Sequence, residues 1–240
     1  MYTATKAIVL GAVKYGEGSR VLRCYTDMYG LQSYMINSLK SKSAVIKPSM
    51  ILPLTQLEII AGHKGKGTLE RIKDARVSQG YEHIPYDAIK NGMALFLVEV
   101  LTKCLHEEQS NDDKFQFITD TCNLLDGIEK TPPHFHIAFL LGLSRFLGFY
   151  PDQNTLKGGI YFDLMHGVFL AIQPLHPHYM DEESTAALKV MLGASLTSVD
   201  VNVPKRTRKK LLAELLAYYK LHVDGFGNLK SVEILEEIFS

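Results

Sequence analysis

The chain has 240 residues, with 26 Lys and Arg, 26 Asp and Glu, and nine His, which is the composition of an ordinary globular protein of one large domain or two small ones. It contains no apolar run of about 18 residues, so no membrane-spanning helix is expected. Lys6 interrupts the apolar start, which argues against a signal peptide. Cys24, Cys104 and Cys122 are too far apart for a disulfide framework or a cysteine metal motif, which predicts a reduced, cytoplasmic protein.

The charges are unevenly distributed along the chain. Residues 1–80 carry 12 Lys and Arg against 5 Asp and Glu, a net of +7, whereas residues 81–196 carry 7 against 15, a net of −8. Residues 197–240 carry 7 against 6, a net of +1. This division predicts a basic module that binds a polyanion, joined to an acidic one. The alternative is that Lys and Arg only keep a small barrel soluble.

The first 80 residues have the pattern of short β-strands. Runs rich in Val, Ile, Leu, Thr and Tyr alternate with turns such as "YGEGS", "DMYG" and "GHKGKG". A closed barrel removes the exposed edges of such strands, so we predict an OB-type barrel over residues 1–80. The expected strands are 5–14, 19–26, 31–38, 54–61 and 68–78.

From Pro85 onward the apolar residues follow helical spacing, so we predict a helical domain over residues 81–240 and an α+β protein overall. "GGIYFDLMHGVFLAIQP" is typical of a hairpin, at about 150–175, with its turn at 165–167. The expected helices are 86–106, one opening at Asp112-Asp113, 134–147, 181–192, 204–223 and 231–239.

No catalytic constellation emerges from the sequence. His166, His176 and His178 form the one cluster with metal-ligand character, but they match no standard zinc spacing, and loop histidines beside prolines are usually only solvated. Carboxylate pairs such as Asp112-Asp113 are explained by the positive end of a helix. We therefore expect neither a metal nor an enzymatic activity.

The basic residues are more informative. Cations that follow a phosphate backbone, interleaved with rings on which bases stack, are what a barrel needs to bind a single strand. Tyr15, Tyr25, Tyr29 and Tyr34 supply such rings, although half of them can equally be core residues. The candidate DNA-binding cations of the barrel are Arg20, Arg23, Lys40, Lys42, Lys47, Arg71, Lys73 and Arg76.

A second basic patch opens the helix expected at 204–223. Cations at a helix N-terminus oppose the macrodipole, so helix stability does not explain them, and an anionic partner or a solvated face does. The patch consists of Lys205, Arg206, Arg208, Lys209 and Lys210.

The order of these features resembles the RecO family of bacterial recombination and repair mediators. "AIVLGAVKYGEGSRVLRCYTDMYGLQSYMINSLKSKS" contains the family's "IVL" strand, "YGE" turn, "T…G" turn and basic loop ending in "KS". "LFLVEVLTKCL" (95–105), "LSRFLGFYPD" (143–152) and "YYKLHVDGFGNLKSVEILEEIF" (218–239) are similar to its later landmarks. The resemblance covers the whole chain.

This resemblance implies an OB barrel, a helical domain and no enzymatic activity. It also implies binding of single- and double-stranded DNA, annealing of complementary strands, and action with RecR to load recombinase onto DNA coated by single-stranded-DNA-binding protein (SSB). The helical domain would receive the acidic SSB tail, and Lys103 and Arg145, on two apolar helices, are the candidate cations.

One departure and two alternatives remain. Many family members carry a four-cysteine zinc site, but residues 150–174 contain no cysteine here, so the hairpin must be held by packing of Tyr161, Phe162 and Phe169. The first alternative function is a generic barrel that binds RNA or DNA in translation or transcription. The second is an enzyme with a metal at His166, His176 and His178.

Overall fold

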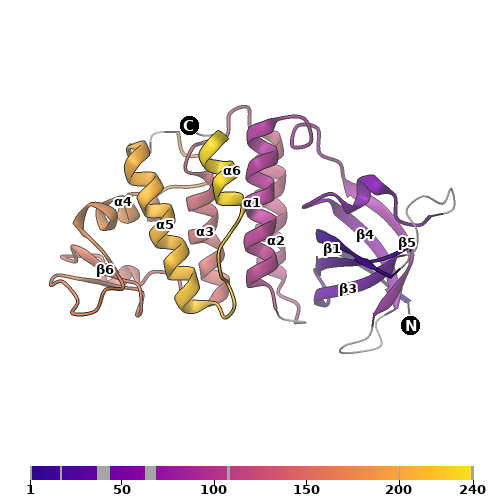
Figure 1. Ribbon diagram of the computed structural model, residues 1–240, viewed down its shortest axis with the longest axis horizontal. Helices are drawn as coiled ribbons and strands as arrows, with labels where there is room; N and C mark the ends of the chain where they lie inside the picture. The colour runs from indigo at the N-terminus through magenta and orange to yellow at the C-terminus, as the bar shows by residue number, and fades with distance from the viewer. Residues whose placement is uncertain are drawn as a thin grey trace. The chain divides into compact units, whose positions relative to one another are not determined.

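The computed structural model describes residues 2–16, 18–36, 44–62, 69–106, 109–199 and 201–238. Contacts divide the chain into two compact units (Figure 1). The first unit comprises Met1–Gly127 and Leu229–Ser240, and the second comprises Ile128–Asn228. Helices α1, α2 and α6 thus belong to the same unit as the barrel, a grouping that differs from the boundary expected at residue 80.

Among the described residues, no helix combines the length and the apolar character needed to cross a membrane.

Five strands of the first unit form a closed barrel in the order β1-β2-β3-β5-β4, with β4 pairing back onto β1 (Figure 1). Every pairing is antiparallel except the short parallel contact between β3 and β5. This is the OB architecture, so the predicted fold class is confirmed. The strands are β1 (Tyr2–Tyr15), β2 (Ser19–Thr26), β3 (Gly30–Ile36), β4 (Gln56–Gly62) and β5 (Glu70–Gln79), and a 3-10 turn η1 (Pro48–Ile51) precedes β4.

The barrel interior follows from the alternation of residues along each strand. Leu22 and Cys24 of β2 point inward, whereas Val21 and Arg23, which alternate with them, point outward. The register of β1 shifts between Val9 and Gly11, and this bulge is what keeps both Val9 and Ala12 on the inner side. The fully or nearly fully buried core comprises Ala7, Val9, Leu22, Cys24, Tyr34, Ile36, Ile46, Met50, Leu57, Ile59 and Ala61.

Three helices complete the first unit: α1 (Ala88–Cys104), α2 (Asp112–Gly127) and α6 (Ser231–Ile238). Asp126 near the end of α2 fixes the segment that leaves the barrel, because its carboxylate accepts hydrogen bonds from the backbone N–H groups of Glu82, His83 and Ile84 at 2.8–2.9 Å. Burial alone would raise the pKa of Asp126, but these bonds outweigh it and hold the pKa below its usual range. Residues 82–84 are thereby anchored to α2.

The second unit packs three helices with a small sheet. Helices α3 (Phe135–Leu147), α4 (Glu182–Leu192) and α5 (Lys205–His222) contact one another, and α4 also contacts the sheet. The hydroxyl groups of Tyr218 and Tyr219 in α5 donate to the carbonyl oxygens of Phe149 and Leu140, at 2.6 and 2.5 Å, which ties α5 to α3 and the residues after it. The remaining elements are η2 (Gln153–Thr155), β6 (Tyr161–Asp163), β7 (Val168–Leu170) and β8 (Tyr179–Met180).

The hairpin expected at 150–175 is present as β6 and β7, with its turn at 164–167. Phe162 and Phe169 are buried with ring centroids 4.9 Å apart, as expected, whereas Tyr161 is half-buried and its ring meets Tyr179 edge-on. Strand β8, which the sequence pattern does not predict, adds a third strand by pairing with β6. It comprises two residues, too few to show a periodicity.

Candidate nucleic-acid interface

A continuous row of side chains crosses the outer surface of four barrel strands. The strand registers place Val13 opposite Val21, Val21 opposite Met35, and Met35 opposite Arg71. A second row places Gly11 opposite Arg23 and Arg23 opposite Ser33. We call this surface the β2–β3 face and define it as Val13, Val21, Arg23, Ser33, Met35 and Arg71. It combines an apolar centre with two guanidinium groups, and all six side chains are at least partly exposed.

The other end of the same strand surface is covered by helix α2. The outward-pointing Tyr25 of β2 retains 1% of its exposure, and its ring centroid lies 6.1 Å from that of Phe115. Gln56 of β4 donates to the side-chain oxygen of Asn123 at 2.7 Å. Helix α2 therefore covers one end of the outer barrel surface, and within the described part of the first unit the β2–β3 face stays open.

Two of the four tyrosines expected to stack on bases are in the core. Tyr34 points into the barrel and is fully buried, and Tyr25 lies under α2, so neither ring is available to a nucleic acid. Tyr29 is half-buried and Tyr15 is 54% exposed at the end of β1. The alternation of side chains along a strand shows that Tyr25 and Tyr34 lie on opposite faces of the sheet. It does not show that α2, which is distant in the sequence, covers the outward-pointing Tyr25.

The three cations of β5 differ in their surroundings. Arg71 belongs to the β2–β3 face, and Lys73 lies with its ammonium 5.2 Å from the ring centroid of Tyr2. Arg76 donates to Glu58 on the neighbouring strand at 2.7 Å and is committed to that ion pair. A register shift of β5 beside Ile60 and Ala61 places both Lys73 and Asp74 on the outer side, because Ile72 and Ala75 pack against the core.

The remaining barrel cations lie elsewhere. Arg20 pairs in register with Lys14 and Ile36 and has the inward parity of Leu22, which places it at one end of the barrel, not on the β2–β3 face. Lys47 is exposed just before η1. Lys40 and Lys42 lie outside the described residues.

The basic patch at the start of α5 is less available than its sequence suggests. Arg208 donates to the carbonyl oxygen of Val203 at 2.5 Å, and Lys210 forms an ion pair with Asp181. Lys205, Arg206 and Lys209 are exposed. Helix α5 begins at Lys205, with Pro204 as its N-cap residue. Within the patch, therefore, Arg208 and Lys210 serve the fold of the second unit.

The two cations expected at an SSB-tail pocket belong to different units. Lys103 is half-buried in the last turn of α1. Arg145 of α3 is exposed, and its guanidinium stacks 4.4 Å from the ring centroid of Tyr150 and donates to the hydroxyl of that tyrosine at 2.9 Å. A shared role for Lys103 and Arg145 stays a prediction.

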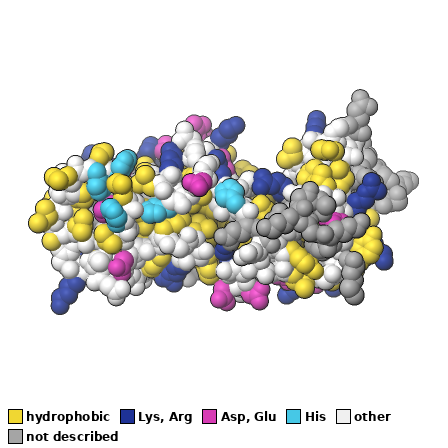
Figure 2. Space-filling model, turned by 90° about the horizontal axis from the view of Figure 1, so that it is seen from below, with side chains coloured by type: hydrophobic (Ala, Val, Ile, Leu, Met, Phe, Trp, Pro, Cys, Tyr) yellow, Lys and Arg dark blue, Asp and Glu magenta, His cyan; other side chains and the backbone are white. Residues whose placement is uncertain are grey.

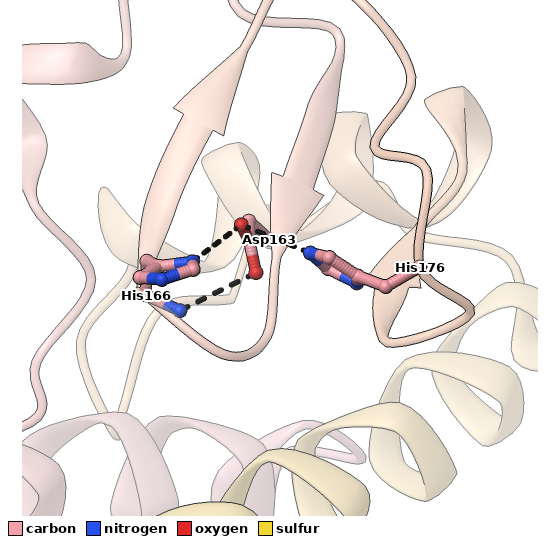
Figure 3. A group of neighbouring side chains, drawn as sticks. All are labelled: Asp163, His166 and His176. Carbon is pink, nitrogen blue, oxygen red and sulfur yellow. Dashed lines mark hydrogen bonds and ion pairs between the residues drawn. The ribbon is translucent and has the colours of Figure 1, made fainter.

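Two of the three histidines considered as metal ligands, His166 and His176, lie together with Asp163. Figure 2 shows histidine side chains gathered on one face of the second unit. Asp163 at the end of β6 lies between His166 and His176, its Oδ2 2.8 Å from Nδ1 of His166 and 3.3 Å from Nε2 of His176 (Figure 3). His178 is not part of this group. Asp163 could not be identified from the sequence, because a lone carboxylate before a turn is common.

The four-cysteine zinc site considered from the family resemblance does not fit this chain. The three cysteines are free, buried and confined to the first unit. Burial raises the pKa of the Cys104 and Cys122 thiols to about 12, so both stay protonated.

Comparison with known proteins agrees with the fold. Residues 1–81 match the family profile described as "Recombination protein O N terminal", and residues 85–233 match "Recombination protein O C terminal". The chain is 36% identical over 241 residues to DNA repair protein RecO of Christiangramia forsetii and 36% identical over 243 residues to that of Flavobacterium psychrophilum. It is 33% identical over 241 residues to that of Bacteroides fragilis. Each of these alignments covers 100% of both chains.

Proposed function

Because the chain belongs to the RecO family of DNA repair proteins, we propose that it is a non-enzymatic mediator of DNA repair and homologous recombination. In this proposal it binds single- and double-stranded DNA, anneals complementary strands and, together with RecR, helps to load recombinase onto SSB-coated DNA in the cytoplasm. The observation that carries the proposal is the β2–β3 face, an outer barrel surface left open by α2 that presents Arg23 and Arg71.

An OB barrel binds oligonucleotides on the surface of strands 2 and 3 and at the loops that join strands 1–2 and 4–5. Here Arg23 on β2 and Arg71 on β5 lie on either side of β3, which carries Ser33 and Met35. A strand laid across Met35 can therefore contact a guanidinium group on each side. The apolar row of Val13, Val21 and Met35 offers van der Waals contact to bases but no donor or acceptor that could distinguish them.

The chemistry of this surface favours binding without sequence preference. Guanidinium groups contact phosphate oxygens, and phosphate contacts position a nucleic acid without reading its bases. Tyr25 and Tyr34, which were expected to stack on bases, cannot do so because both are buried. Affinity should thus depend mainly on phosphate contacts and fall steeply with salt.

Annealing of complementary strands tests the proposal. A triple variant, Arg23→Ala/Arg71→Ala/Lys73→Ala, removes both guanidinium groups of the β2–β3 face together with Lys73, the next outward-pointing cation of β5, and is called the face variant. Its matched control, Lys130→Ala/Lys157→Ala/Lys230→Ala, removes three exposed lysines elsewhere. Each lost phosphate contact lowers single-strand affinity about fivefold at 0.1 M salt, so three lower it roughly 100-fold. Annealing of two labelled oligonucleotides should slow accordingly in the face variant and not in the control.

Two results would contradict the proposal. Equal annealing rates for the face variant and the wild type would remove the β2–β3 face from DNA binding. A marked preference for RNA over DNA of the same sequence would instead favour a barrel that acts in translation or transcription.

A further inference from the structure

We propose that Asp163, His166 and His176 form a thiolate-free site for a divalent transition-metal ion, with Zn²⁺ as the expected occupant. One ligand atom from each of the three residues lies within 4.8 Å of the other two. The ligand atoms would be Oδ2 of Asp163, Nδ1 of His166 and Nε2 of His176. Two imidazoles and one carboxylate suit Zn²⁺ and its neighbours in the first transition row, whereas Mg²⁺ and Ca²⁺ prefer oxygen ligands alone.

The two oxygens of Asp163 have separate tasks. Oδ1 accepts the backbone N–H groups of Met165 at 2.7 Å and His166 at 3.3 Å, which locks the carboxylate into the turn after β6. Oδ2 is the oxygen that faces both imidazoles (Figure 3). In metal sites, hydrogen bonds to one oxygen of a carboxylate commonly orient the other oxygen, which binds the metal.

The fold also fixes the turn that carries these ligands. Gly167 has φ +68°, and an ideal Cβ there would lie 2.5 Å from the hydroxyl oxygen of the buried Tyr218. A glycine is therefore required at this position, both for the left-handed backbone and for the close approach of α5. Asp163 itself is 4% exposed, and within the described part of the chain its ion-pair partners are the two histidines.

The spacing requires little adjustment. Ligand atoms about 2.1 Å from a tetrahedral ion lie about 3.4 Å from one another. The 3.3 Å separation between Asp163 and His176 already matches, and the 2.8 Å separation between Asp163 and His166 needs to widen slightly. One ring nitrogen of each histidine lies within 4.8 Å of the other, so two such atoms need to approach by at most about 1.4 Å to reach that edge length. Rotation of two side chains, both at least partly exposed, accomplishes this.

Metal binding competes with one hydrogen bond. Nδ1 of His176 accepts the backbone N–H of His178 at 3.2 Å, which leaves the proton of a neutral ring on Nε2, facing Asp163. To coordinate the ion, Nε2 must lose this proton. In the neutral ring the proton then sits on Nδ1, which can no longer accept the N–H of His178. The bond that is given up is long, at 3.2 Å, so its loss costs little. A site with three protein ligands and no thiolate should still release its ion to a chelator. The protein dialysed against a chelator is accordingly expected to contain no zinc.

The ion would join three segments of the small sheet. Asp163 ends β6, His166 lies in the turn before β7, and His176 precedes β8. The segment between β7 and β8 exposes 81% of Ile172 and all of Leu175, so its own apolar contacts hold it weakly. A metal at this position would fasten that segment to β6. Cysteines cannot do this here, because all three belong to the first unit.

Zinc titration of the untagged full-length protein tests the site. After chelator dialysis, calorimetry should show one Zn²⁺ bound per chain, and Zn²⁺ should raise Tm by a few degrees and slow chymotrypsin cleavage after Leu175. His166→Ala and His176→Ala should each weaken binding on the order of 100-fold, since even outer-shell changes cost 10–100-fold. His178→Ala, an exposed neighbour outside the ligand set, is the matched control.

Both histidine variants change side chains that are exposed or half-buried, so they should fold as the wild type does. No stoichiometric binding by the wild type would overturn the proposal, and so would binding that is unchanged in His166→Ala and His176→Ala.

Discussion

The carboxylate of Glu99 in α1 forms the N-terminal cap of α6 through Ser231, 132 residues later in the chain. It accepts the hydroxyl of Ser231 at 2.6 Å and the backbone N–H groups of Ser231 at 2.8 Å and Lys230 at 2.9 Å. Burial alone would raise the pKa of Glu99, but these three bonds hold it below its usual range. Gly92 on the same helix permits the contact, because a Cβ there would collide with Ile238.

Glu99→Ala should therefore loosen α6 from α1. It leaves three donors at a helix N-terminus without their acceptor, and such losses cost about 1–3 kcal/mol. Urea unfolding should show a lower midpoint for Glu99→Ala and a smaller loss for Glu99→Gln, which keeps one acceptor. Glu233→Ala, an exposed glutamate in the first turn of α6, is the control. A loss in Glu99→Ala no larger than in this control would show that the cap contributes nothing.

His136 should make the protein less stable in acid. It is buried in α3, and this burial, with positive charge at His134 and Arg208, lowers its pKa from 6.5 to about 3. Between these values the unfolded chain binds a proton that the folded chain does not, so stability falls as pH falls from 6.5, by up to about 1.4 kcal/mol per pH unit. Replacing His136 with Leu, of similar size, removes this dependence.

The measurement is urea unfolding of the wild type and His136→Leu at several values of pH from 7.0 to 4.5. The difference in unfolding free energy should move by about 2–3 kcal/mol in favour of the variant across this range. Parallel pH profiles would mean that His136 takes up its proton over the same pH range in the folded and the unfolded protein, which would contradict the lowered pKa.

The basic loop before η1 should add affinity without specificity. Replacing Lys40, Lys42 and Lys47 with Ala removes three cations that can contact phosphate, and each contact contributes roughly 0.7 to the slope of log affinity against log salt for a single strand. The slope should flatten by about 2 while thermal unfolding stays unchanged. The control replaces Lys130, Lys157 and Lys230, which are exposed, and leaves Lys114 unchanged because Lys114 is buried. A stronger effect of the control triple would contradict this role of the loop.

SSB should bind through its C-terminal tail. The family resemblance predicts a site on the apolar helices for this acidic tail, and the acidic balance of residues 81–196 means that a few local cations must receive it. A pull-down with full-length SSB should succeed and one with tail-truncated SSB should fail. Lys103→Ala and Arg145→Ala then test each candidate cation separately. Equal capture of both forms of SSB would count against tail recognition.

The sequence predicts the helices and strands better than it predicts the contacts that these elements make with one another. Strand and helix periods depend on neighbouring residues, so the barrel strands and all six helices were found within a few residues of their bounds. The burial of Tyr25 was not predictable, because Phe115, which covers it, is 90 residues away in the chain. Strand β8 was too short to show a pattern. Asp163 meets His166 within the turn after β6, but it meets His176 only through the pairing of β6 with β8, which places Asp163 opposite Tyr179.

The central claim is that the β2–β3 face holds DNA by its phosphates, and its most direct test is the salt dependence of single-strand affinity. Fluorescence anisotropy with one labelled oligonucleotide, measured from low to moderate salt, gives this slope for the wild type, for Arg23→Ala/Arg71→Ala/Lys73→Ala and for the Lys130/Lys157/Lys230 control. We expect the face variant to flatten the slope by about 2 and the control to leave it unchanged. An unchanged slope in the face variant, with wild-type affinity at every salt concentration, would contradict the account.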